Sequence, residues 1–323
     1  MSSNNQTRRK FIGNVMGAGI AVSLGKFNPA LNNLENEKSN PQQVMVFSKQ
    51  LEWIKDRNEL CELVSKIGFD GFELTVRPKG YVIPERVEED LPLMAEAAEK
   101  AGIKIIMIAT RITDPRDPIA ERTLKTANQL GIKMYRMGGL QYDESKSIEK
   151  NLAEFKAILK DLSQLNKEYH IHGAYQNHAG SNRVSASIWD LWYLLKDLDP
   201  KWMGCQYDTR HSQLEGGSWW PIGLQLIHPF IKTTVVKDFK WIEQNNRKKV
   251  QNCPIGTGEV DFESYFKLVK KLNITGPISL HFPYTFVENN NISKQEKLDK
   301  ILAFMKIHGI EKLRNMLKVS GVN

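Results

Sequence analysis

Cysteine is scarce in this sequence. Cys61, Cys205 and Cys253 are the only three in 323 residues, too few and too unevenly spaced for a disulfide framework or a zinc cluster. Because cysteine is among the residue types most often buried, we expect three buried thiols with no shared role.

The sequence also lacks a run in which basic and aromatic residues alternate, although its formal net charge is +8. Grooves that bind single-stranded nucleic acid combine these two kinds of side chain. The lysines are instead scattered along helical faces, which indicates a solvated surface. We therefore expect no nucleic-acid partner.

The apolar run near the amino terminus is too short for a membrane span of roughly 20 residues. It reads NVMGAGIAVSLG and follows TRRKFIG, so that Arg8 and Arg9 precede a Gly- and Ala-rich segment. This pattern resembles a twin-arginine export signal. We expect a signal in residues 1–30, a polar linker in 31–43 and the folded part in 44–323. The expected location is the periplasm, with no stable membrane insertion beyond the signal. An uncleaved anchor stays open, since no clear cleavage site follows.

From Val44 onward the sequence repeats one unit, a short β-rich run followed by a loop and an amphipathic helix. Eight units of this length predict a single-domain α/β fold, the (β/α)8 TIM barrel. A doubly wound open sheet would more often carry a Gly-rich phosphate loop after its first strand, and FSKQLEWI has none. The predicted strands are VMVFSK, GFELTV, KIIMIATR, KMYRMGG, HGAYQNH, MGCQYDTRH, KTTVVKD and PISLHFPY.

Polar side chains stand where most of these strands end. The carboxyl ends of TIM-barrel strands meet at one face, where active sites form, so we expect a converging polar pocket. Four arginines among these side chains could hold a phosphate or a carboxylate. They are Arg77, Arg111, Arg136 and Arg210. Because free sugar phosphates are uncommon outside the cytoplasm, the expected export favours a substrate without phosphate.

Three stretches together resemble the sugar phosphate isomerase/epimerase group of xylose isomerase-like TIM barrels. They are YQNHAG, CQYDTRHSQLEGG and PIGTGEVDFESYFKLVKKLNITGPISLHFPY. The most specific pieces are the D-x-x-H pair of Asp208 and His211, the KD closing strand seven, and G-x-G-x-x-D-F. The resemblance covers essentially the whole chain after the linker. It implies a divalent cation (Mn, Mg or Zn) held by a Glu, an Asp, a His and a Glu on strands five to eight. In that family the two glutamates also move a proton between adjacent sugar carbons.

At one of those four positions the chain has the same residue type as the family. Asp208 matches, whereas Gln176, Val235 and His281 stand where the family has Glu, His and Glu. Gln176 and His281 still offer an oxygen and a nitrogen, but both are neutral and would hold a hard cation more weakly. We therefore expect at most a tentative metal site of Gln176, Asp208 and His281, and no two-glutamate proton shuttle.

These departures favour a sugar isomerase/epimerase-like enzyme that acts on a small carbohydrate, with His281, His211 or Lys237 transferring the proton. The expected substrate-binding residues are Lys49, Glu73, Arg77, Arg136, His178, Arg210 and Trp219. A metal-free lyase acting on a keto-sugar or glycoside stays open, as does a non-catalytic exported sugar-binding protein. A nuclease of the endonuclease IV group, which shares this barrel, would need more His and Glu ligands.

The stretch EGGSWWPIGL predicts either a loop over the pocket or a contact in a homo-oligomer.

Overall fold

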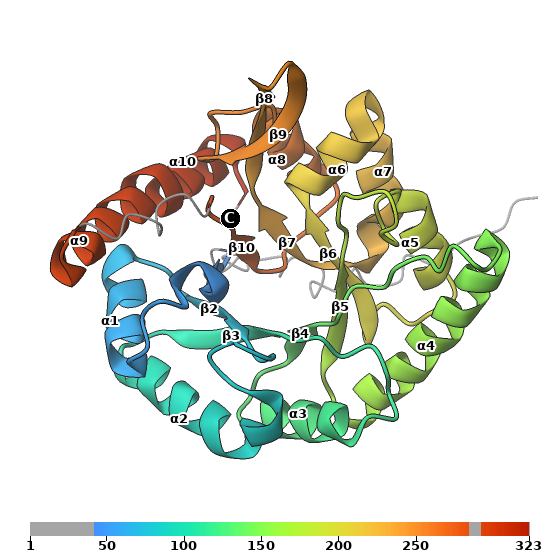
Figure 1. The fold of residues 1–323 in the computed structure, drawn as a ribbon, viewed down its shortest axis with the longest axis horizontal. Coiled ribbons are helices and arrows are strands. Elements are labelled where there is room, and N and C mark those ends of the chain that lie inside the picture. The colour runs from blue at the N-terminus through green and yellow to red at the C-terminus, as the bar shows by residue number, and fades with distance from the viewer. Residues whose placement is uncertain (1–41, 284–291, 323) are drawn as a thin grey trace, which may run out of the picture. The chain divides into compact units, whose positions relative to one another are not determined.

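Eight parallel strands close into a barrel in the computed structural model, which describes residues 42–283 and 292–322. The strands form the inner ring and the helices lie outside them (Figure 1). This confirms the predicted single-domain (β/α)8 TIM barrel, and each predicted strand supplies one strand of the ring. The barrel strands are β1 (Val44–Phe47), β2 (Gly71–Thr75), β3 (Lys104–Ala109), β4 (Met134–Arg136), β5 (His172–Gln176), β6 (Met203–Asp208), β7 (Ile231–Val236) and β10 (Ile278–Leu280).

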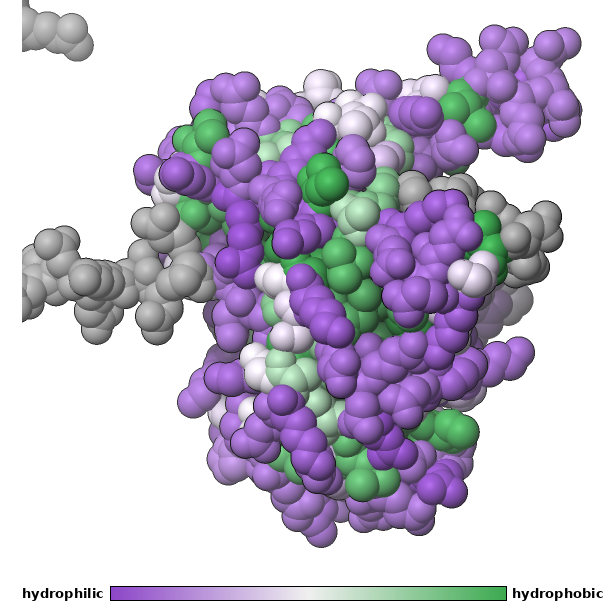
Figure 2. All heavy atoms as spheres, turned by 90° about the vertical axis from the view of Figure 1, so that its left-hand side faces the viewer, coloured by the Kyte–Doolittle hydropathy of each residue, from purple (hydrophilic) through white to green (hydrophobic). Residues whose placement is uncertain are grey.

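Helices follow the strands and cover the outside of the ring. They are α1 (Arg57–Ile67), α2 (Val87–Lys100), α3 (Pro118–Gln129), α4 (Ile148–Glu168), α5 (Ile188–Leu195), α6 (Thr209–Gly216), α7 (Trp220–Ile227), α8 (Phe262–Lys271), α9 (Lys294–Met305) and α10 (Glu311–Ser320). The side on which α1, α2 and α9 lie shows mostly hydrophilic side chains with scattered hydrophobic ones (Figure 2), as expected for amphipathic helices whose apolar faces point inward. None of the helices in the described residues is long and apolar enough to cross a membrane.

An antiparallel hairpin of β8 (Asp238–Gln244) and β9 (Arg247–Cys253) leaves the barrel after β7. Its turn residues Asn245 and Asn246 both have a positive φ, 53° and 56°, the conformation of a type I′ hairpin turn that asparagine tolerates well. The sequence pattern predicts no strand for most of this segment.

Asp238 explains why two of the family-like motifs occur together. Its carboxylate accepts hydrogen bonds from the backbone N–H groups of Thr257, Gly258 and Val260 at 2.9–3.2 Å. Asp261, three residues beyond Gly258, then caps α8 by accepting a hydrogen bond from the N–H of Ser264. The aspartate that follows strand seven therefore holds the loop that leads into α8.

The expected signal segment and linker, residues 1–30 and 31–43, fall almost wholly outside the described residues. Export through the twin-arginine route stays a prediction. The three cysteines are buried and free, as expected.

Gly71 is required where β2 packs against β3. A Cβ at this position would lie 2.0 Å from the backbone oxygen of Lys104, so Gly71→Ala must displace one strand. We expect the substitution to lower the free energy of unfolding by about 2 kcal/mol, measured by urea denaturation. The matched control is Gly216→Ala, because a Cβ there meets its nearest atom at 3.5 Å and alanine is favourable in a helix. Equal stability of Gly71→Ala and the wild type would contradict this account of the β2–β3 contact.

Candidate active site

Glu73 of β2 lies at the centre of a polar network at the mouth of the barrel. Its side chain is fully buried, and its Oε1 lies 2.9 Å from Nη1 of Arg136. Its Oε2 accepts hydrogen bonds from Oγ of Ser279 and from Nε2 of His281, the latter at 3.0 Å. Burial alone would raise the pKa of Glu73, but the Arg136 guanidinium and these hydrogen bonds outweigh it and lower the pKa to about 2. The carboxylate is therefore ionised, and Arg136 compensates its charge.

Gln176, at the end of β5, connects this ion pair to a second carboxylate. Its Oε1 accepts a hydrogen bond of 2.5 Å from Nη1 of Arg136, and its Nε2 donates one of 2.9 Å to Oδ2 of Asp208. An amide can accept and donate at once, whereas an ionised glutamate can only accept. A neutral amide is thus the side chain that suits the position between a guanidinium and a carboxylate.

Asp208 and His211 hold each other in place at the start of α6. Asp208 Oδ1 accepts the N–H of His211 at 3.0 Å, which caps the helix. Burial alone would raise the pKa of Asp208, but the His211 ring and the Lys237 ammonium outweigh it and lower the pKa to about 2. Nδ1 of His211 accepts the N–H of Ala179 at 3.1 Å and lies 2.7 Å from Nη1 of Arg210. Its proton therefore sits on Nε2, which faces Asp208 Oδ2 at 3.6 Å. Burial lowers the pKa of His211 to about 3, so the ring is neutral and both of its nitrogens are occupied.

His281 differs from His211 because one of its nitrogens is free. The Glu73 carboxylate can only accept, so the proton of the His281 ring must lie on Nε2. Nδ1 then carries a lone pair, and it makes no hydrogen bond within the described part of the chain. The ring stacks on Phe47 with centroids 4.5 Å apart. Burial lowers the pKa of His281, and Glu73 opposes that shift. The result is an oriented, neutral imidazole, which is the form a general base requires.

Lys237 lies beside His281 at the ends of neighbouring strands. Leu280 pairs with Val236 in the register of β10 and β7, and the N–H of His281 donates to the oxygen of Val236 at 3.1 Å. The Lys237 ammonium makes no hydrogen bond or ion pair with the described residues, and burial lowers its pKa. A lysine of depressed pKa next to a neutral imidazole gives the site a second proton-transfer group.

The tentative metal ligands do not fit a divalent cation as they are arranged here. The oxygen that Gln176 could offer already accepts a hydrogen bond from the cationic Arg136, and Nε2 of His281 is directed at Glu73, which leaves only Nδ1 of that ring as a ligand. Both oxygens of Asp208 also accept hydrogen bonds. In residues 42–283 and 292–322, no group of three or more His, Cys, Asp or Glu side chains could hold a metal ion. The guanidinium of Arg136 repels a cation at this position. Its own positive charge stands where the charge of a metal ion would otherwise lie.

Three of the predicted substrate-binding residues come together around a cavity of about 150 Å³. Arg77, Arg136 and His178 line it with Gln176. Nδ1 of His178 donates to the backbone oxygen of Gln176 at 2.9 Å, and burial lowers the pKa of His178 to about 4. Lys49 is exposed on the turn after β1.

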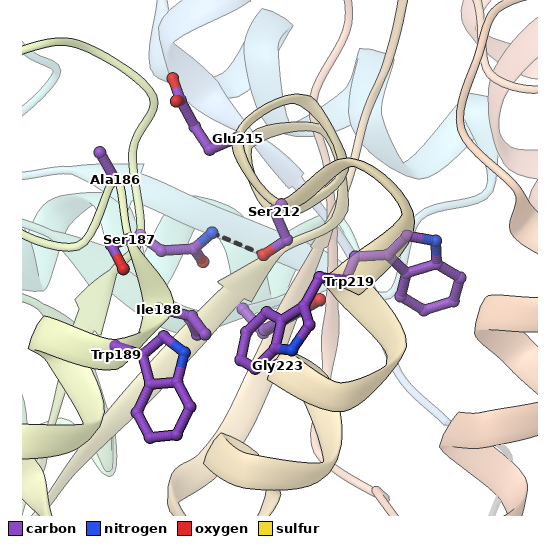
Figure 3. Close-up of a pocket in the computed structure, with 12 residues that line it drawn as sticks. Ala186, Ser187, Ile188, Trp189, Ser212, Glu215, Trp219 and Gly223 are labelled. Atoms are coloured by element: carbon purple, nitrogen blue, oxygen red, sulfur yellow. Dashed lines mark hydrogen bonds between the residues drawn. The ribbon is translucent and has the colours of Figure 1, made fainter.

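Trp219 lies away from this network, in a larger cavity of about 380 Å³ outside the strands. Figure 3 shows Trp189 of α5 and Trp219 side by side, with Ser212 and Glu215 of α6 above them. The two tryptophan rings stack with centroids 5.5 Å apart. A role of Trp219 in substrate binding stays a prediction.

Sequence reasoning missed several side chains of the site because no motif marks them. Phe47 and Ser279 lie on strands whose sequences are mostly apolar, so nothing distinguishes them from core residues. Asn177 lies between Gln176 and His178, and only those two neighbours are predicted site residues. Arg183 lies in the loop after β5. Loops that follow barrel strands reach the barrel mouth, and this general rule is the only signal in the sequence that could have indicated Arg183.

Comparisons with known proteins agree with this architecture. A family model described as "Xylose isomerase-like TIM barrel" matches residues 61–308, which is most of the chain. The comparison with curated proteins found no match.

The following solved structures share the fold but are distant in sequence. A 3-keto-D-glucoside 4-epimerase from E. coli is 13% identical with a TM-score of 0.60, over 82% of this chain and 99% of that one. A sugar phosphate isomerase/epimerase from Parabacteroides distasonis is 14% identical with a TM-score of 0.55, over 84% and 98%. A probable 3-DHS dehydratase from Bacillus anthracis is 12% identical with a TM-score of 0.60, over 81% and 98%. At these identities the likeness shows the fold alone.

Glu73→Gln should destabilise the protein strongly at neutral pH, because it leaves the Arg136 charge buried without its partner. We expect a loss of about 3–5 kcal/mol in the free energy of unfolding at pH 7, measured by urea denaturation. The pKa of Glu73 is lower in the folded protein, so its contribution is present above its ordinary pKa of 4.5 and is lost as pH falls toward 2. The difference between wild type and variant should therefore shrink between pH 5 and pH 2.

The matched control for this test is Glu263→Gln, on a side chain that is 79% exposed and paired with Lys267. Surface pairs of this kind contribute at most about 1 kcal/mol. If Glu73→Gln cost no more than Glu263→Gln at pH 7, Glu73 would not be the ionised centre of the network.

Proposed function

The chain belongs to the xylose isomerase-like TIM barrel family, and we propose that it is an enzyme that moves a proton next to the carbonyl of a sugar or sugar derivative. The observation that carries this proposal is the state of His281, a neutral imidazole whose Nε2–H is held by Glu73 while Nδ1 has no partner among the described residues. An isomerase or epimerase needs such a base at the barrel mouth. This chain lacks the family's two glutamates there.

In the proposed reaction, Nδ1 of His281 takes the proton from the carbon next to the carbonyl. The imidazolium that forms is stabilised by the Glu73 carboxylate on Nε2, 3.0 Å away. Arg136 keeps Glu73 ionised, so Glu73 orients and stabilises His281 and does not take the proton itself. In this arrangement His281 is the base and Glu73 orients it, whereas the resemblance to the family implies one glutamate as the base.

Lys237 has the second role. As an ammonium it can stabilise the enolate oxygen that develops when the proton leaves. With its lowered pKa it can also return a proton from a different direction, which epimerisation requires. The proposal assigns no step to a divalent cation, because the side chains at the expected ligand positions are engaged with Arg136 and Glu73.

Two lines of support make a sugar the proposed substrate. Proteins with this fold include the 3-keto-D-glucoside epimerase and the sugar phosphate isomerase/epimerase named above. The amide and hydroxyl groups around Gln176 and the aromatic ring of Phe47 are also the kinds of group that bind sugar hydroxyls and ring faces. We propose in addition that the enzyme works in the periplasm after folded export, on the basis of the arginine pair near its amino terminus.

A lyase is the second candidate, because β-elimination starts with the same proton abstraction. Return of the proton gives an isomer or epimer, whereas departure of a leaving group from the next carbon gives an unsaturated product. The dehydratase with this fold supports keeping this candidate, and so does the loss of the two-carboxylate arrangement that returns the proton in the family. A non-catalytic sugar-binding protein would produce neither product.

His281→Gln tests the proposal, since glutamine can still donate to Glu73 but cannot act as a base. The purified protein is incubated in D2O with 3-keto-glucosides and ketohexoses, and deuterium at the carbon next to the carbonyl is followed by NMR. We expect exchange by the wild type and a loss of about 10²- to 10⁴-fold in His281→Gln, with KM little changed. Signals of an unsaturated product would favour the lyase.

The control is His228→Gln, because His228 precedes β7 at the opposite end of the barrel. It should exchange deuterium at the wild-type rate. Exchange in His281→Gln at that same rate would contradict the role given to His281.

A further inference from the structure

Four arginines surround the cavity of about 150 Å³ that adjoins the catalytic network. Arg77, Arg111, Arg136 and Arg183 line it, and no aspartate or glutamate among the described residues does. We call these four residues and their cavity the arginine pocket. Guanidinium groups stay protonated at any physiological pH, so the pocket concentrates four positive charges that repel one another. An anion in the cavity would reduce this repulsion.

Pairing within the protein compensates only part of this charge. Arg136 is neutralised by Glu73, and Arg77 approaches Glu52 at 3.5 Å, which is a weak contact. Arg111 and Arg183 make no side-chain hydrogen bond or ion pair in the described segments of the chain. Asp114, which shares a loop with Arg111, pairs instead with Arg116 at 2.9 Å.

The loops hold Arg111 and Arg183 in these positions through their backbones. The loop after β5 pairs with the loop after β4 through a bridge between Gln141 and Arg183 and a hydrogen bond of 2.9 Å from Tyr142 N to Asn182 O. Gly138 packs against the loop after β3, where its N–H donates to Ile112 O at 2.8 Å. The positive charges therefore converge before any ligand arrives, which lowers the entropic cost of binding.

Two glycines after β4 lie close to Arg111 and Arg183. A Cβ at Gly138 would lie 2.7 Å from the backbone oxygen of Arg111, and one at Gly139 would lie 3.5 Å from Nη1 of Arg183. Arg183 thus reaches across the backbone after β4 toward the cavity. Arg210, which the sequence suggested as a fourth anion ligand, lies instead beside His211, and Arg183 takes that place in the pocket.

We propose that the arginine pocket binds an anionic group, a carboxylate or a phosphate, carried by the sugar substrate. Planar guanidinium groups bind both kinds of oxyanion with paired hydrogen bonds. A cavity of about 150 Å³ has room for such a group. Arg136 and Gln176 belong both to the pocket and to the network that ends at His281, so an anion bound here places the rest of the substrate over the catalytic groups.

The sugar part of this proposal rests on the proposed function, and the anion part can be tested by binding alone. Calorimetry compares D-fructose with D-fructose 6-phosphate and D-glucose with D-glucuronate, using the wild-type protein. We expect at least one anionic sugar to bind more tightly than its neutral counterpart. Preference for the phosphate identifies a sugar phosphate as the source of the anion, and preference for the uronate identifies a sugar acid. If neither anionic sugar binds more tightly than its neutral counterpart, the proposal is overturned.

Arg183→Gln and Arg111→Gln show whether the preference belongs to this pocket. Each should weaken binding of the anionic sugar about 10- to 100-fold and leave binding of the neutral sugar unchanged. The matched control is Arg247→Gln, on an exposed arginine at the turn of the hairpin, which should bind as the wild type does. Arg111 is exposed, so its variant keeps the test valid if Arg183→Gln does not fold. Undiminished preference in both pocket variants overturns the assignment to this pocket.

Deuterium exchange on the same sugars separates the two proposals. Tight, arginine-dependent binding of an anionic sugar without proton exchange supports the pocket and contradicts the proposed function. Exchange on anionic sugars no faster than on their neutral counterparts, at rates that neither pocket variant changes, supports the proposed function and overturns the pocket.

Discussion

The buried ion pair between Glu73 and Arg136 is the interaction on which the rest of the barrel mouth depends. A carboxylate with no exposure to water is costly unless it is paired and hydrogen-bonded, and Glu73 obtains both from Arg136, Ser279 and His281. Once the carboxylate is ionised, the tautomer of His281 follows, because an acceptor on one side requires the proton on Nε2. The free lone pair at Nδ1 is a consequence of that ion pair.

The same ion pair accounts for the neutral amide at position 176, where the resemblance to the family predicts a glutamate. Nη1 of Arg136 contacts both Glu73 and Gln176, and Gln176 in turn donates a hydrogen bond to Asp208. A guanidinium among the side chains expected to hold a metal repels a cation and attracts an anion. The neutral groups beside it and the arginines of the adjoining loops add to this preference for anions. The proposed base and the proposed anion pocket meet at Arg136.

The fold could be predicted almost fully from the sequence, because eight repeated strand–helix units leave few architectures. The hairpin of β8 and β9 could not, since its alternation of polar residues resembles that of a loop. For the site, the rule that polar residues at strand ends converge was enough to collect Glu73, Arg136 and His281. It could not say which nitrogen of a histidine is free, nor that His211 is fully engaged with Ala179 and Arg210, because both depend on contacts between distant segments. Arg183 lies in a loop whose path only the folded chain defines.

The central claim is that this barrel transfers protons with a carboxylate-oriented histidine where its family is expected to use a metal. The most direct test measures metal content and turnover on one sample of purified protein, before and after treatment with a chelator. The account predicts far less than one metal ion per chain and deuterium exchange that the chelator does not reduce. One manganese, magnesium or zinc ion per chain, with exchange lost on chelation and restored by adding the ion back, would contradict it.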